Sequence, residues 1–207
     1  MHVAVPLYPR FTALDAVGPY TVLAFTPGWS VTFVAAVPGP VVDDNGKLSI
    51  TATAAFEDVP RPDVILVPGG PGTVAAMGDE GLLSWIRAAH EHTRWTTSVC
   101  SGSFVLGAAG VLTGRRATSH WGWVDQLSAV GAQPVKERVV IDGRIVTAAG
   151  VSAGIDMALA LLAEAADEET ARTVQLAIEY DPQPPFGGAD PHTAPGARRE
   201  AALSLIS

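Results

Sequence analysis

The sequence predicts an α/β fold in which a mainly parallel β-sheet is covered by helices on both faces. Two observations support this class. Short apolar, β-branched runs at residues 2–7, 31–37 and 64–67 are typical of buried strands. Segments with apolar residues at helical spacing separate these runs, and the alternation continues through residues 82–112. Repeated strand–helix alternation favours parallel strands joined by helices, and therefore a three-layer α/β/α sandwich.

In the first half of the chain the pattern predicts an interrupted helix and a hairpin. Residues 12–25 are apolar at helical spacing. Gly18 and Pro19 are expected to kink or restart this helix, because proline cannot donate an interior helical hydrogen bond. The turn signal DDNG at residues 43–46 lies between two apolar runs, so we expect a small hairpin to project from the main sheet there.

The second half continues the alternation and ends in a different composition. The elements expected there are a strand at 96–99, a hairpin around Asp142 and Gly143, and helices at 82–92, 101–112, 152–165 and 168–180. From about residue 181 the chain is rich in proline and glycine, so we expect an irregular tail that lies over the body or over a partner subunit. We interpret residues 1–207 as a single domain.

Composition and charge disfavour several classes of protein. With 48% hydrophobic and 16% charged residues, the chain can bury a continuous core and is not of the disordered class. The net charge is −8 and the basic residues are scattered, which disfavours a nucleic-acid partner. Neither a secretory pattern nor an apolar run of about 18 residues is present, so we expect no membrane partner and a cytoplasmic location.

The sequence does not indicate a metal or a cofactor. The five histidines form no ligand pattern, and His90 and His92 are expected to point to different faces of one helix. The glycine-rich segment after residue 67 lacks the G-x-G-x-x-G spacing of dinucleotide sites, and no Gly-Lys-Ser/Thr follows it. We therefore expect neither a metal nor a cofactor.

Cys100 is the single cysteine, and it lies where a predicted strand meets a predicted helix. Its neighbours are small, in the order SVCSGS at residues 98–103, as in a nucleophile elbow, although Ser98 stands where the first glycine is usual. The N-terminus of the following helix is expected to favour the thiolate. The alternative is that Cys100 packs as a buried small apolar residue, and its spacing alone does not decide between the two.

The turn at Gly69 and Gly70 ends another predicted strand and could aim backbone N–H groups at the same crevice. We expect the N–H groups of Gly70 and Ser101 to stabilise an oxyanion there. The alternative is an ordinary turn between a strand and a loop.

Two further side chains could reach the same crevice. Asp15 lies in an otherwise apolar run, where it is either a capping or turn aspartate or a proton donor and acceptor for Cys100. In the second case burial should raise its pKa. His120 either pairs with Cys100 or packs structurally near Trp121 and Trp123. Asp156, on an apolar helix, is assigned a structural role.

Together these motifs resemble the ThiJ/PfpI superfamily, whose members are class I glutamine amidotransferase-like. The segments that carry the resemblance are LDAVGP (14–19), VPGG (67–70), VCSGS (99–103) and GRRATSHW (114–121), and TAAGVSAGID (147–156) and EYDPQPPF (179–186) also fit. The resemblance implies a flavodoxin-like fold and a homodimer. It also implies that Cys100 is the nucleophile, Asp15 its acid/base partner, Ser101 a positioning residue and His120 a pocket residue.

Within the superfamily, the chain is most similar to isonitrile hydratases. The shared features are an aspartate in the first helix, a serine after the cysteine, and the EYDPQPPF segment. PfpI-type proteases and deglycases usually carry glutamate at the position of Asp15, and the proteases carry histidine at that of Ser101. The resemblance implies hydration of a small isonitrile, R–N≡C, to a formamide without a cofactor. A glyoxalase or deglycase acting on α-oxoaldehydes and a non-catalytic cysteine-based redox sensor or regulator are the alternatives.

Overall fold

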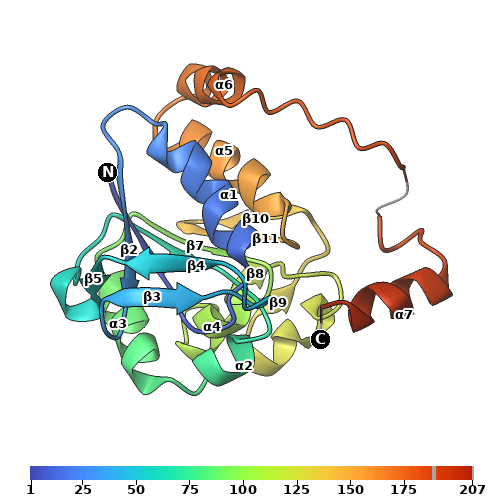
Figure 1. Cartoon of the computed structure of the whole chain (residues 1–207), viewed down its shortest axis with the longest axis horizontal. Coiled ribbons are helices and arrows are strands. Elements are labelled where there is room, and N and C mark those ends of the chain that lie inside the picture. Colours follow the sequence, from blue (N-terminus) through green and yellow to red (C-terminus); the bar gives the residue numbers. More distant parts are fainter. Residues whose placement is uncertain (188–189, 207) are drawn as a thin grey trace.

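The computed structural model describes residues 1–187 and 190–206, and its main sheet has the order β10-β11-β7-β6-β1-β2-β5 (Figure 1). Adjacent strands of this sheet are parallel, apart from the antiparallel pair β10–β11. The strands are β1 (His2–Pro6), β2 (Ser30–Ala35), β5 (Ala54–Ala55), β6 (Val64–Val67), β7 (Trp95–Val99), β10 (Val139–Asp142) and β11 (Ile145–Ala148). The prediction of a mainly parallel sheet is confirmed.

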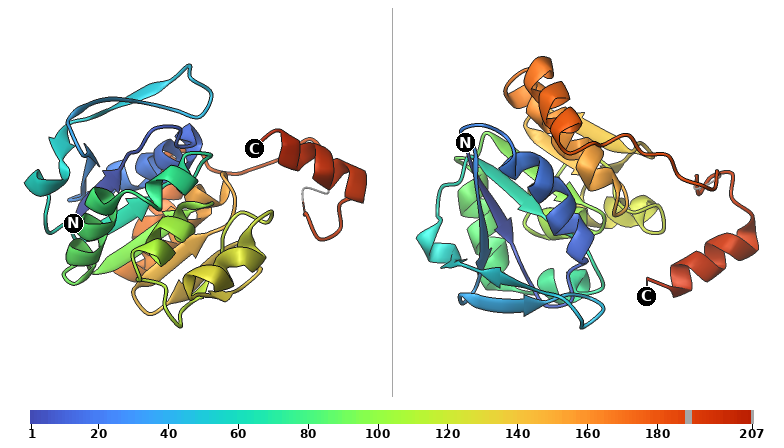
Figure 2. Two further views of the ribbon diagram at one scale, coloured as in Figure 1. Left: turned by 90° about the horizontal axis from the view of Figure 1, so that it is seen from below. Right: turned by 45° about the horizontal axis from the view of Figure 1, so that its top comes forward.

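Helices cover both faces of the sheet, which gives the expected three layers (Figure 2). On one face lie α1 (Ala13–Ala24) and α5 (Ala153–Ala165), with α6 (Glu168–Ala177) packed on α5. On the other lie α2 (Thr73–Ala76), α3 (Glu80–His90) and α4 (Gly102–Ala108). All four residues of β6 are buried, because a central parallel strand has helices on both sides.

The expected restart of the first helix at Gly18 and Pro19 is wrong, because α1 is continuous from Ala13 to Ala24 with Pro19 inside it, and the expected kink stays a prediction. Close packing against α5 accounts for this. A Cβ on Gly18 would lie 3.1 Å from the Ile155 side chain, and a Cβ on Gly154 would lie 3.2 Å from the Pro19 ring. Burial of α1 against α5 therefore outweighs the cost of a proline in a helix interior, which is about 3 kcal/mol.

Both hairpins are confirmed. The first consists of β3 (Gly39–Val42) and β4 (Ser49–Ala52), which pair with each other outside the main sheet. It is attached to the start of α1, since the Asp44 N–H donates to the Phe11 carbonyl at 2.9 Å and the Thr12 hydroxyl donates to the Asp44 carboxylate at 2.7 Å. The second consists of β10 and β11. The remaining short elements are η1 (Phe56–Asp58), β8 (Arg116–Ala117), η2 (Val124–Val130) and β9 (Gln133–Pro134).

The C-terminal segment is only partly irregular, because it contains the helix α7 (Gly196–Ser204). Good helix formers, mainly alanine, arginine and leucine, follow Pro195 and explain a helix that the proline and glycine content of the tail concealed. The segment extends away from the sheet, and α7 lies beside the body (Figure 1). Its contact with the body is made at Gly122, where a Cβ would lie 2.5 Å from the Leu203 side chain. None of the described helices has both the length and the apolar character needed to cross a membrane.

A pair of leucine substitutions tests where the core lies. Leu161 on α5 is fully buried, whereas Leu176 on α6 is 82% exposed. Leu161→Ala leaves a cavity beside α5 and should lower the free energy of unfolding by about 2–5 kcal/mol. Leu176→Ala removes the same atoms from the surface and should change it by less than about 0.5 kcal/mol. Urea denaturation followed by circular dichroism measures both, and equal losses would contradict the assignment of the core.

Candidate active site

The residues singled out in the sequence meet at the carboxyl edge of the parallel sheet. Cys100 follows β7, and Gly69 and Gly70 follow the adjacent strand β6. Asp15 lies in the first turn of α1, which follows β1 on the other side of β6. Crevices at the carboxyl ends of neighbouring strands are the usual ligand sites of such sheets. The sheet order therefore brings Cys100, Ser101, Asp15 and the glycine turn together.

The Cys100 backbone has the geometry of a nucleophile elbow. Its φ angle is +56°, a left-handed backbone conformation that residues other than glycine rarely adopt. The Cys100 N–H donates to the carbonyls of Ala148 and Ala149 at 3.1 and 2.8 Å. Its carbonyl accepts hydrogen bonds from the hydroxyls of Ser103 at 3.1 Å and Ser119 at 2.9 Å. These contacts on both sides of the residue stabilise a strained turn.

Glycines allow the turns after β6 and β7 to touch. A Cβ on Gly102 would lie 2.3 Å from the Val67 carbonyl oxygen, and a Cβ on Gly69 would lie 2.5 Å from the Ser101 nitrogen. Gly70 has a φ angle of +135°, which strongly favours glycine. The glycine turn is therefore more than a boundary between a strand and a loop, because its backbone contacts the elbow.

Asp15 is completely buried, and its carboxylate does not cap its own helix. Instead Oδ2 accepts a hydrogen bond of 3.0 Å from the Gly69 N–H, and Oδ1 has no hydrogen-bond partner among the described residues. Burial raises the pKa of Asp15 to about 7, and the Asp44 charge adds to this, while the Gly69 N–H and the nearby Cys100 thiol partly offset it. The expected rise in pKa is confirmed, and the carboxyl titrates near neutral pH.

The environment of Cys100 does not favour the thiolate. Burial raises the pKa of the thiol well above its ordinary value, and the negative charge of Asp15 raises it further. The backbone N–H groups of Ser101 and Val151 and the Ser101 hydroxyl lower this pKa only in part. The Ser101 N–H at the start of the following helix favours the thiolate, as expected, but burial and the Asp15 charge outweigh it. At neutral pH the thiol and the carboxyl hold at least one proton between them.

The N–H of Gly70, expected to stabilise an oxyanion, donates to the Ser101 hydroxyl at 2.9 Å. The same hydroxyl lies 2.8 Å from that of Thr73, which is 3.2 Å from the Tyr8 hydroxyl. Tyr8 in turn donates to the Pro68 carbonyl at 2.6 Å. The Ser101 hydroxyl also lies 3.4 Å from the Gly70 carbonyl, and either oxygen can donate in each contact between two hydroxyls. These contacts therefore fix the position of the Ser101 oxygen beside the turn.

Sequence reasoning missed three residues of this site: Tyr8, Thr73 and Val151. Tyr8 and Thr73 are fixed by contacts between segments that lie 65 residues apart. Val151 has no distinctive chemistry, since its contribution is a backbone N–H directed at the Cys100 sulfur. Its position was accessible in principle, because it follows β11, the other neighbour of β7 in the sheet.

His120 is buried and lies beside the site without a hydrogen bond to Cys100 among the contacts of the described residues. Its ring centroid is 5.3 Å from that of Trp121 and 5.1 Å from that of Trp123. Its Nδ1 accepts a hydrogen bond of 3.2 Å from the Gly122 N–H. Burial lowers the pKa of His120 to about 4, so the imidazole is neutral at physiological pH. This geometry favours the packed alternative over the cysteine–histidine pair.

The arrangement is suited to nucleophilic addition with proton transfer. It combines a buried sulfur, a carboxyl with a pKa near neutrality, and N–H groups that face the sulfur. Within residues 1–187 and 190–206, no three His, Cys, Asp or Glu side chains are grouped so that they could hold a metal ion.

Comparison with known proteins places the chain in a family. The DJ-1/PfpI family model matches residues 1–164. The chain is 48% identical over 204 residues to an isonitrile hydratase from Pseudomonas putida, covering 96% of this chain and 89% of that protein. It is 34% identical over 147 residues to the HTH-type transcriptional regulator CdhR from Pseudomonas aeruginosa, covering 70% of this chain and 41% of the regulator.

A solved structure shares nearly the whole fold. A THiJ/PfpI family protein from Pseudomonas syringae superposes with a TM-score of 0.94 at 40% sequence identity, covering 99% of this chain and 85% of that one. The match includes the flavodoxin-like sheet and the elements around the site. The chain therefore belongs to the DJ-1/PfpI family.

Proposed function

We propose that this protein is an isonitrile hydratase, a hydro-lyase that combines R–N≡C with water to give an N-substituted formamide. The observation that carries the proposal is the 48% identity, over 96% of the chain, to an isonitrile hydratase. The buried pair Cys100 and Asp15 supports it, because addition to an isonitrile carbon needs a nucleophile and a group that moves protons at neutral pH.

In the first half of the proposed reaction, the Asp15 carboxylate takes the thiol proton as the Cys100 sulfur attacks the terminal carbon of R–N≡C. A sulfur–carbon bond forms, and one carbon–nitrogen π bond becomes a lone pair. Asp15 then gives the proton to the same carbon, which leaves the thioimidate R–N=CH–S–Cys100. The raised pKa of Asp15, about 7, suits a group that both accepts and releases this proton.

In the second half, water adds to the thioimidate carbon while Asp15 moves one of its protons to the nitrogen. The adduct R–NH–CH(OH)–S–Cys100 then collapses: the carbon–sulfur bond breaks, a carbonyl forms, and Asp15 transfers the hydroxyl proton to the departing sulfur. The N–H groups of Ser101 and Val151 stabilise the developing thiolate. The products are R–NH–CHO and the original thiol, so atoms and charge balance.

The remaining residues have supporting roles in this proposal. Gly69 orients the Asp15 carboxylate through its N–H, and Gly70 orients the Ser101 hydroxyl in the same way. Ser101 contributes its own N–H to the sulfur. His120, neutral and packed against two tryptophans, forms part of the pocket wall and transfers no proton.

Removing either member of the pair should abolish or strongly reduce turnover. Cys100→Ala should show no measurable hydration of cyclohexyl isocyanide, and Asp15→Asn should lower kcat/KM by about 10²- to 10⁴-fold, the usual contribution of a positioned acid/base group. Formation of the formamide, followed by gas chromatography, measures both. Arg172→Gln, which removes an exposed arginine paired with Glu168 on α6, is the matched control.

Normal turnover by Cys100→Ala or Asp15→Asn would sink the mechanism. A parallel assay with methylglyoxal tests the alternative enzyme class. Loss of methylglyoxal without isonitrile turnover would identify a glyoxalase or deglycase instead, and absence of both activities would favour a cysteine-based sensor.

The pH dependence of kcat/KM should follow Asp15. The proposed reaction needs the Asp15 carboxylate to accept the thiol proton, and burial raises the pKa of Asp15 to about 7. Protonation below that pH removes the base, so kcat/KM should fall about tenfold per pH unit and be about 100-fold lower at pH 5 than on the plateau above pH 7. Residual activity of Asp15→Asn should lack this dependence. A flat wild-type profile between pH 5 and 8 would contradict the assignment.

A further inference from the structure

The loop between β11 and α5, residues 149–152, passes beside the Cys100 sulfur. Ala149 is fixed from two directions, because its N–H donates to the Arg138 carbonyl at 2.9 Å and its carbonyl accepts the Cys100 N–H at 2.8 Å. Two residues later, the Val151 N–H is directed at the sulfur. The position of this loop therefore decides whether Val151 can stabilise negative charge there.

A cluster of polar side chains holds the far end of the loop. The Arg138 guanidinium donates to the Ser152 hydroxyl at 3.3 Å and to Oδ2 of Asp156. The Tyr180 hydroxyl donates to Oδ1 of the same carboxylate at 2.8 Å. Each oxygen of Asp156 thus accepts from a different partner, and the carboxylate orients the guanidinium toward the loop.

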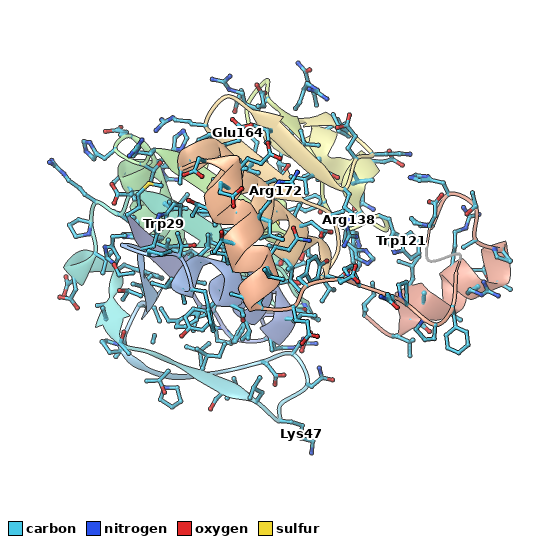
Figure 3. The ribbon with its side chains drawn as sticks, turned by 90° about the horizontal axis from the view of Figure 1, so that it is seen from above. Trp29, Lys47, Trp121, Arg138, Glu164 and Arg172 are labelled. Carbon is cyan, nitrogen blue, oxygen red and sulfur yellow. The ribbon has the colours of Figure 1, made fainter. Side chains whose placement is uncertain are left out.

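Tyr180 connects this cluster to a part of the chain that the proposed reaction does not use. It follows α6 and begins the segment that leads to the tail. Figure 3 shows Arg138 on the side of the body where this segment leaves, whereas Arg172 lies on α6. The Arg138 side chain is 53% exposed and that of Asp156 31%, so their ion pair contributes little to stability by itself. The hydrogen bond from Arg138 to Ser152, however, connects this ion pair to loop 149–152.

We propose that Arg138, Asp156 and Tyr180 form a positioning cluster that holds loop 149–152 so that the Val151 N–H meets the Cys100 sulfur. Two loops then supply N–H groups to the sulfur: the elbow through Ser101 and the β11–α5 loop through Val151. None of the three cluster residues touches the reacting atoms. The inference rests on Cys100 as the proposed nucleophile, and not on the identity of the substrate.

Other ionisable groups also face the sulfur, and the test must separate them from the cluster. Asp15 on α1 is the nearest charge, and Tyr8, which follows β1, is buried with a pKa raised by burial. His120 lies across the loop, where a Cβ on Gly150 would be 2.6 Å from its ring, and it is neutral. The charge of Arg138 could itself favour the thiolate, so variants are needed that change position without changing charge.

Alkylation of Cys100 measures the effect directly, because the chain contains one cysteine. The rate of reaction with iodoacetamide, followed by intact mass spectrometry between pH 6 and 10, reports the fraction of thiolate. Tyr180→Phe removes one hydrogen bond and no charge, and Arg138→Lys keeps the charge but loses the planar fork that spans Ser152 and Asp156. Each should slow alkylation at pH 8 by about 3- to 10-fold and shift the profile to higher pH, as expected when one hydrogen bond to the sulfur is weakened.

The double variant should react no more slowly than Arg138→Lys alone, because both changes act through one carboxylate. Arg172→Gln should retain the parent profile. Parent-like profiles for both Tyr180→Phe and Arg138→Lys would overturn the proposal, even if the melting temperature falls, because the cluster would then be merely structural. The proposal would also be overturned if Arg138→Gln shifted the pH profile of alkylation while Tyr180→Phe and Arg138→Lys did not. The charge of Arg138 would then explain the effect. Isonitrile turnover is not needed for any of these outcomes, so a failure of the proposed function remains distinguishable.

Discussion

The rest of this structure depends on one constraint: Cys100 and Asp15 are two acids in one buried site, and burial disfavours a charge on both at once. The Cys100 thiol and the Asp15 carboxyl are brought together by the sheet order, and burial raises the pKa of each. The fold places few compensating groups there: one N–H on Asp15, and two N–H groups with a hydroxyl on Cys100. The proton shared by this sulfur and this carboxyl is therefore a product of the architecture, because burial disfavours the charged form of both groups.

The same constraint explains the unusual backbone around the site. The Asp15 carboxyl meets the turn after β6 because the start of α1 lies against this turn, where the Thr12 N–H donates to the Gly69 carbonyl at 2.8 Å. The left-handed conformation at Cys100 is stabilised from the end of β11 and from the hydroxyls of Ser103 and Ser119. Central strands supply the rigidity, and short loops supply the groups that meet the sulfur.

Local patterns in the sequence predicted the strand alternation, both hairpins, and the elbow context of Cys100, because each depends on neighbours in the chain. They failed where distant segments decide. Packing of α5 against Gly18 and Pro19 keeps α1 continuous where a restart was expected, and contacts between distant segments place Tyr8 and Thr73 beside Ser101. The direction of the Cys100 pKa shift depends on how deeply the sulfur is buried, which spacing does not reveal. The catalytic roles of Cys100 and Asp15 stay predictions.

The hydrogen bond between the Gly70 N–H and the Ser101 hydroxyl has a consequence for charge at the site. This N–H already has an acceptor, so it can bind a second oxygen only by giving up the hydroxyl. The N–H groups of Ser101 and Val151, in contrast, lower the pKa of the Cys100 thiol. A group that gains negative charge beside Cys100 therefore depends on the two N–H groups at the sulfur, and the turn after β6 acts through the serine that it orients.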